Sequence, residues 1–129
     1  MDPMQTGLFA LAEQRLAWTD RRQALLAQNI ANASTPGFRP SDLPPFAQTL
    51  ARTAAAPART QPGHLAGTAG DPLQPDRSVL PAARAPDGNA VALDEQLTKV
   101  ADTETTQAMV TTIYKKYLSL FSLALGHSA

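Results

Sequence analysis

Residues 29–38 read Asn-Ile-Ala-Asn-Ala-Ser-Thr-Pro-Gly-Phe, and this stretch decides where the first long helix of the chain can end. Pro36 disfavours helical backbone at the residue before it, Thr35, so a helix that runs into this stretch cannot pass through it. Pro36 and Gly37 suit the two central positions of a type II turn that Thr35 opens and Phe38 closes. The sequence therefore predicts a helix that ends by Thr35, with a tight turn directly after it.

Composition narrows the function classes. The 129 residues carry 11 basic and 11 acidic side chains, so the formal net charge is zero, whereas nucleic-acid-binding proteins normally carry a basic excess. The chain has no cysteine, which excludes disulfides, thiolate metal sites and a cysteine nucleophile. Its two histidines, His64 and His127, lie far apart in the sequence. We therefore expect no catalytic site, no metal, no cofactor, no nucleic acid and no small-molecule substrate.

The prolines divide the chain into parts. Ten of the eleven lie between Pro36 and Pro86, and proline disrupts a helix interior because it lacks the backbone donor and clashes with the preceding turn. We therefore predict an all-α fold in which long N- and C-terminal helices form a coiled-coil-like hairpin. The predicted segments are an N-terminal helix in 1–35, a turn and connecting segment in 36–53, a flexible Pro/Ala/Gly-rich loop in 54–86 and a C-terminal helix in 87–129.

The loop prediction for the middle segment follows from its shortage of apolar side chains. Residues 47–86 contain five large apolar residues, six prolines and no aromatic residue. That apolar surface is too small to offset the conformational entropy that is lost when such a length of chain is ordered. The alternative for this segment is a small β-domain, because proline and glycine are also common in β-turns.

Apolar residues recur along the first predicted helix at alternating spacings of three and four, the heptad pattern of a helix packed on another helix. Asp2, Pro3 and Gln5 fit a capping box at its start. The members of this first row are Phe9, Ala12, Leu16, Thr19, Gln23, Leu26, Ile30 and Ala33. A second row of Leu11, Trp18 and Leu25 lies about 100° around the helix. Two helices cannot cover both rows, so we expect a neighbouring subunit to cover the second; the alternative is a wide core face in a monomer.

The second predicted helix carries a similar row. Its members are Leu93, Leu97, Val100, Glu104, Gln107, Thr111, Tyr114, Leu118, Phe121 and Leu125. The three consecutive polar members are expected to fix the register of the helix pair. From Val110 onward a parallel row makes most of the circumference apolar, so this half should be buried on several sides. Asp94 is the expected N-cap and Gly126 the expected stop.

Three stretches of the sequence resemble a known family. The string NIANASTPGF resembles the signature of the bacterial flagellar axial proteins, the rod and hook subunits, and is carried by Asn29, Ile30, Asn32, Thr35, Pro36, Gly37 and Phe38. The string DGNAVALDEQL at 87–97 resembles the second conserved block of the proximal rod members, carried by Asp87, Gly88, Asn89, Val91, Leu93 and Asp94. The string IYKKYLSLFSLAL at 113–125 resembles their C-terminal helix. In one departure, Thr106 precedes Gln107 where the family usually has an aromatic residue.

This resemblance implies a structural role. Such proteins are subunits of the rod, the drive shaft that crosses the periplasm from the membrane ring to the hook of the flagellum. They leave the cytoplasm through the flagellar type III export apparatus, and the N-terminus of this chain has no pattern of a cleaved secretory signal. The implied partners are other rod subunits, further copies of this chain, the basal-body adapter protein FliE, the membrane ring and the export gate.

Two other function classes, an export chaperone or adapter and an enzyme, would lead to different expectations. A helical export chaperone or adapter of a secretion system would also present apolar helix faces, but it has no need of the turn from Thr35 to Phe38. An enzyme would have to use Asp94, Glu95 and His64, and nothing in the sequence orients these side chains toward one another.

Overall fold

The computed structural model describes residues 7–54, 71, 73–75 and 91–126. Three helices form in this part of the chain: α1 (Gly7–Ala31), α2 (Phe46–Ala54) and α3 (Leu93–Ala124). The described residues contain no β-strand. The predicted all-α fold with long N- and C-terminal helices is therefore confirmed, and the short helix α2 is an addition that the sequence analysis did not foresee.

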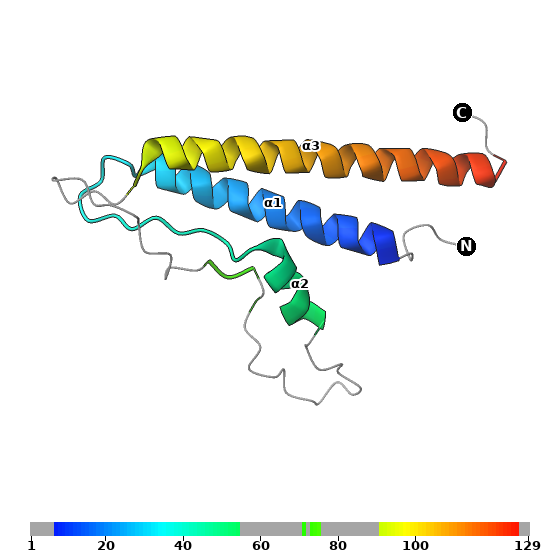
Figure 1. The fold of residues 1–129 in the computed structure, drawn as a ribbon, viewed down its shortest axis with the longest axis horizontal. Coiled ribbons are helices and arrows are strands. Elements are labelled where there is room, and N and C mark those ends of the chain that lie inside the picture. The colour runs from blue at the N-terminus through cyan, green and yellow to red at the C-terminus, as the bar shows by residue number, and fades with distance from the viewer. Residues whose placement is uncertain (1–6, 55–70, 72, 76–90, 127–129) are drawn as a thin grey trace.

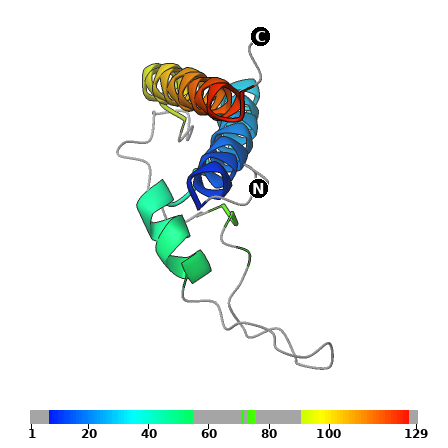
Figure 2. The same ribbon diagram turned by 90° about the vertical axis from the view of Figure 1, so that its right-hand side faces the viewer.

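The two long helices lie side by side and run in opposite directions (Figures 1 and 2). Near the start of α1, the ring of Phe9 meets the edge of Tyr114, with 5.1 Å between the ring centroids. Near its end, the amide of Asn29 hydrogen-bonds to that of Gln96. These two contacts fix the antiparallel pairing, so the predicted hairpin of terminal helices is confirmed.

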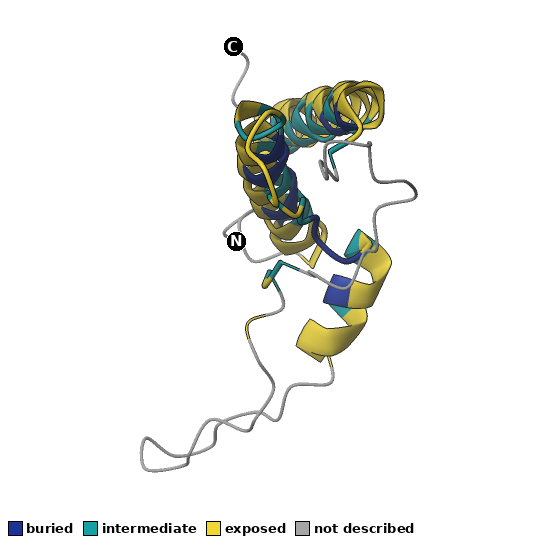
Figure 3. Cartoon of the chain, turned by 90° about the vertical axis from the view of Figure 1, so that its left-hand side faces the viewer, coloured by how far each residue is buried: buried dark blue, intermediate teal, exposed yellow. Residues whose placement is uncertain are grey.

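The first row of α1 faces α3 as predicted. Phe9, Thr19 and Leu26 are buried, and the other members within α1 are half-buried (Figure 3). On α3 the row is correct from Gln107 to Phe121, where its members are half-buried, but it is displaced by one residue nearer the start of the helix. There the buried residues are Gln96 and Thr103, while Leu93 and Leu97 are about half exposed.

The second row of α1 is covered from within the chain, which corrects the expectation of a covering subunit. Trp18 and Leu25 form a buried cluster with Leu43, against which Phe46 and Leu73 also pack. The indole Nε1 of Trp18 donates a 2.9 Å hydrogen bond to the carbonyl of Pro44. The connecting segment, and not a neighbouring subunit, therefore covers Trp18 and Leu25, and Leu11 is the member of this row that stays exposed.

The helix ends show which local signals operate. α1 ends at Ala31, and the turn from Thr35 to Phe38 closes with a 3.2 Å hydrogen bond from the Phe38 amide to the Thr35 carbonyl. Gly37 has φ +75°, as the third position of a type II turn requires. Gly126 has φ +76° and ends α3 as expected.

The start of α3 differs from the prediction. Its N-cap is Ala92, which makes no side-chain capping bond, whereas Asp94 was expected there. Asp94 and Glu95 instead lie in the first turn, where their charge is favourable beside the positive end of the helix dipole.

Several predictions fall outside the described residues. These are the capping box at residues 2–5, almost all of the loop at 54–86, both histidines and the first three residues of the second block, Asp87, Gly88 and Asn89. Within the middle segment, Leu73 is described and packs against the Trp18 cluster, so part of that segment contributes to the core.

Candidate functional site

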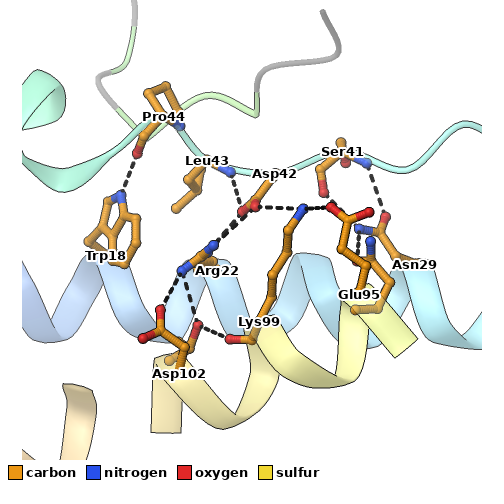
Figure 4. Close-up of polar contacts among 12 residues, drawn as sticks. Trp18, Arg22, Asn29, Ser41, Asp42, Leu43, Pro44, Glu95, Lys99 and Asp102 are labelled. Carbon is orange, nitrogen blue, oxygen red and sulfur yellow. Dashed lines mark hydrogen bonds and ion pairs between the residues drawn. The ribbon is translucent and has the colours of Figure 1, made fainter. Parts of the chain in front are cut away.

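A buried amide joins the three parts of the fold. Asn29 is 1% exposed and lies near the end of α1. Its Nδ2 donates to the Ser41 carbonyl at 2.8 Å and to Oε1 of Gln96 at 2.9 Å, while its Oδ1 accepts from the Ser41 amide at 3.1 Å (Figure 4). One side chain of the signature stretch therefore holds the connecting segment and α3 against α1.

A network of charges continues from this amide along the groove between the helices (Figure 4). Arg22 forms a two-point contact with Asp42, through Nε to Oδ1 at 3.0 Å and Nη2 to Oδ2 at 3.2 Å. Its Nη1 reaches Asp102 of α3 at 3.5 Å. Lys99 bridges Asp42 at 3.6 Å and Glu95 at 2.8 Å. Because the Arg22 and Asp42 side chains are only 15% and 12% exposed, their pairing resists salt better than a surface ion pair does.

Aromatic rings hold a second arginine at the edge of this network. The Arg15 guanidinium lies 4.8 Å from the Trp18 ring and 4.6 Å from the Phe46 ring. Burial and the nearby charge of Arg22 lower the pKa of Arg15, and Asp102 acts in the opposite direction. Within the described part of the chain the guanidinium donors of Arg15 have no hydrogen-bond acceptor, so the two ring faces and the more distant charge of Asp102 hold this cation.

Two of the three polar members of the predicted row, Glu104 and Gln107, make hydrogen bonds across the helix pair, and so does the neighbouring Thr103. Nε2 of Gln107 donates to Asp20 at 2.7 Å, and Nε2 of Gln23 donates to Glu104 at 3.2 Å. Thr103, fully buried, accepts a 3.4 Å contact from Arg22 and donates to the Lys99 carbonyl. These directional bonds between fixed positions support the prediction that polar residues set the register.

Two hollows lie beside the helix pair. One, of about 190 Å³, is apolar and lies between α1 and α2, lined by Gln14, Ala17, Phe46, Thr49, Leu50, Thr53 and Leu73. The other, of about 400 Å³, is polar and lies over the charge network, lined by Arg15, Trp18, Arg22, Asp42, Leu43, Pro45, Phe46 and Asp102. Neither lining contains a histidine beside a hydroxyl group, the pairing that nucleophilic catalysis by serine or threonine commonly uses.

Large apolar side chains remain on the outside of the helix pair. On α3 they are Leu93, Leu97, Met109, Ile113, Tyr117, Leu120 and Leu123, followed by Leu125, all between 42% and 68% exposed. Leu8 and Leu11 of α1 are exposed to a similar degree. An apolar surface of this extent on a small helical chain is typical of a protein-interaction face.

The predicted signature residues divide between interior and surface. Asn29 is buried, Ile30, Asn32 and Phe38 are half-buried, and the turn residues Thr35, Pro36 and Gly37 are exposed. Of the second block, Val91 is half-buried, and Leu93 and Asp94 are exposed. Among the predicted packing residues, Leu16, Val100, Tyr114, Leu118 and Phe121 are half-buried. Whether the exposed members, Leu97 and Leu125, contact neighbouring subunits stays a prediction.

The chemistry-bearing residues do not converge in the described structure. Glu95 is paired with Lys99, Asp94 faces outward, and His64 lies outside the described residues. In that same part of the chain, no three His, Cys, Asp or Glu side chains come close enough together to bind a metal ion. Nor is any helix there long and apolar enough to span a membrane.

Sequence reasoning missed α2 and the buried partners of Asn29. The signal for α2 was present, because Phe46, Thr49, Leu50 and Thr53 recur at helical spacing after two prolines. Nothing in the sequence marks Gln96 as buried, because its neighbour Leu97 is the residue type that is more often found in the interior.

Comparison with known proteins gives a consistent result. Residues 4–39 match the model of the flagella basal body rod protein family. The chain is similar to the flagellar basal body rod protein FlgB of Agrobacterium fabrum, 33% identical over 112 residues that cover 79% of this chain and 78% of that protein. It is also similar to FlgB of Proteus mirabilis, 31% identical over 126 residues that cover 89% of this chain and 91% of that protein.

Proposed function

This chain belongs to the flagellar basal body rod protein family and is a structural subunit of the rod, and we propose that it occupies the proximal end of that rod. The observation that carries the proposal is the similarity to two FlgB proteins, which covers 78% of one and 91% of the other. The second block and the C-terminal string of the sequence resemble proximal rod proteins, which supports the same position.

The structure supports a role in assembly rather than in chemistry. A rod subunit has to hold a fixed shape and to present surfaces to several neighbours. The contacts of Asn29, Arg22 and Gln107 with the other long helix fix the pairing of α1 and α3, and the exposed apolar residues of α3 offer surface for neighbours. In our proposal the chain works without catalysis and without a cofactor.

The proposed partners are the components that adjoin the proximal end of a rod: other rod subunits, further copies of this chain, the adapter FliE, the membrane ring and the export gate. The proposed location is the periplasmic part of the basal body, which the chain reaches by type III export without cleavage of a signal peptide. As part of the drive shaft, it transmits torque from the membrane ring toward the hook.

Purified basal bodies test this proposal. The chain should be present in them, its deletion should abolish swimming, and antibody labelling should place it at the end of the rod nearest the membrane ring. Labelling at the hook end, or absence from basal bodies that are otherwise complete, would contradict the proposed position. A chaperone or adapter would be found with the export apparatus and not in the purified rod, so the same fractions separate the two functions.

A further inference from the structure

The uncovered end of the helix pair is the strongest unexplained surface. The connecting segment contacts α1 from Asn29 to Arg15, through Ser41, Asp42, Pro44 and Phe46. At Phe46 the chain enters α2, which leads away from the two long helices (Figures 1 and 2). Beyond that point the large apolar side chains on this flank of α1 and α3 are exposed.

Helical spacing places the exposed apolar residues on this flank. Residues 7, 11 and 18 positions after Asp102 lie within about 20° of it around an α-helix, and they are Met109, Ile113 and Leu120. Asp102 lies on this flank of α3, because it contacts Arg22, and Arg22 is also bound by Asp42 of the connecting segment. On α1, Leu11 lies 11 positions before Arg22, on the same line. We call Leu8, Leu11, Met109, Ile113 and Leu120, which are 39% to 57% exposed, the apolar end face.

The charges around the apolar end face are basic. Residues 105–126 of the chain contain two lysines and no acidic residue, and Lys116 lies about 40° from the line of Asp102. Arg15 lies on the same line of α1 as Leu11, and its guanidinium donors have no acceptor in the described part of the chain. A surface that pairs with this face should therefore be apolar and acidic.

The other end of α3 has that character. Residues 91–104 contain four acidic residues and one lysine. Leu93 and Leu97, one turn apart, are 46% and 51% exposed, and Asp94 lies beside them in the exposed first turn. We call these three residues the acidic end patch. It is too far along the rigid helix from the apolar end face for the two to meet within one molecule, because each residue adds about 1.5 Å.

From this complementarity we propose that the acidic end patch of one copy binds the apolar end face of a second copy, in a head-to-tail contact. Leu93 and Leu97 pack on Leu11, Ile113 and Leu120, and Asp94 faces Lys116. The two surfaces differ, so the contact is heterologous and can repeat from copy to copy, which is how rings and helical filaments are built. The inference rests on the proposed function, since it describes how subunits of this rod would meet.

Cysteine crosslinking tests the contact directly, because the chain has no cysteine of its own. Leu97→Cys and Ile113→Cys copies are produced together, and purified basal bodies are oxidised. A dimer is expected from the mixture and not from either variant alone, because a head-to-tail contact brings unlike positions together. Thr112→Cys serves as the control, since Thr112 is exposed on α3 but lies about 100° from Ile113.

Charge reversal provides an independent test. Lys116→Glu and Asp94→Lys should each lower the amount of chain in basal bodies by at least about tenfold, because like charges in contact across an interface strongly oppose binding. The double variant should restore it, because the contact regains opposite charges. Lys115→Glu is the matched control, one residue away on another side of α3.

The outcomes separate this inference from the proposed function. Absence of the wild-type chain from basal bodies contradicts the proposed function. If the chain is present and the mixture gives no dimer, the head-to-tail contact is refuted and the rod assignment stands. A dimer from Leu97→Cys or Ile113→Cys alone refutes it in favour of a symmetric contact. Loss of incorporation without rescue in the double variant refutes it in favour of a different partner at this end.

Discussion

Replacing Asn29 with alanine should destabilise the fold more than any other single change in the signature stretch. The substitution removes three hydrogen bonds from a side chain that is 1% exposed. At a net value of about 1 kcal/mol for each bond, the free energy of unfolding should fall by about 3 kcal/mol. The buried amide oxygen of Gln96 also loses its partner in the variant, which adds the cost of an unsatisfied buried group to that figure.

Urea unfolding followed by circular dichroism measures this effect. The purified chain is measured at a protein concentration above which its helical circular dichroism signal no longer increases. With a denaturant dependence of about 1–3 kcal/mol per molar urea for a chain of this size, the midpoint should move down by about 1–3 M. Asn29→Asp should be similarly destabilised, although it has the same shape, because its carboxylate cannot donate to Ser41 or Gln96.

Asn32→Ala is the matched control, one helical turn away. Asn32 is only half-buried and bonds locally, to the Gln28 carbonyl at 2.9 Å and to Thr35 at 3.2 Å. Its replacement should cost less than about 1 kcal/mol, because water can satisfy the groups it leaves. Equal unfolding midpoints for Asn29→Ala and Asn32→Ala would refute the view that one buried amide joins the three parts of the fold.

Three further outcomes are expected. Phe121→Ala should abolish swimming in soft agar, because truncation of this half-buried ring removes packing between the helices in every assembled copy, up to about 3–5 kcal/mol once a neighbour buries it fully, whereas Lys115→Ala should swim; the opposite result would show that the packing face of α3 is assigned wrongly. Arg22→Ala should lower the free energy of unfolding by about 3 kcal/mol and Arg21→Ala, which is exposed, by less than about 0.5 kcal/mol; similar values for the two would rule out a stabilising charge network. Replacing residues 55–70 with a flexible linker of the same span should leave incorporation into basal bodies intact. Leu73→Ser should shift the fluorescence emission of Trp18, the one tryptophan, toward the red, because Leu73 packs against the Trp18 cluster; an unchanged emission spectrum would place Leu73 outside the core.

The elements that the sequence predicts well are those set by local rules. Proline exclusion located both long helices, and the Pro36-Gly37 pair located the turn that follows α1. The heptad row succeeded on α3 from Gln107 to Phe121, a stretch in which the last three members, Tyr114, Leu118 and Phe121, have large rings or an aliphatic side chain. Each of these features depends on residues a few positions apart, so a short stretch of sequence is enough to predict it.

The features that escaped prediction depend on distant partners. The predicted row included Leu93 and Leu97, because leucine is the usual buried residue, but Gln96 is the residue that lies in the interior. A buried glutamine is stable only if its amide has partners, and here the partner is Asn29, 67 positions earlier in the chain. Similarly, the second row of α1 is covered by Leu43 and Phe46, which a count of two helices leaves out.

The position of the polar contacts explains how a chain with so much exposed apolar surface keeps one shape. Both buried residues of α3, Gln96 and Thr103, are polar and bond to fixed points on α1. A shift of α3 by one turn along α1 would break the Asn29–Gln96 and Arg22–Thr103 bonds and leave the buried Gln96 amide without its partner, at about 1–3 kcal/mol for that group. Apolar contacts alone would tolerate such a shift, because leucine packs against leucine in several registers. The polar half of the hairpin therefore sets the register, and the apolar half, held in place by it, stays free to bind a neighbour.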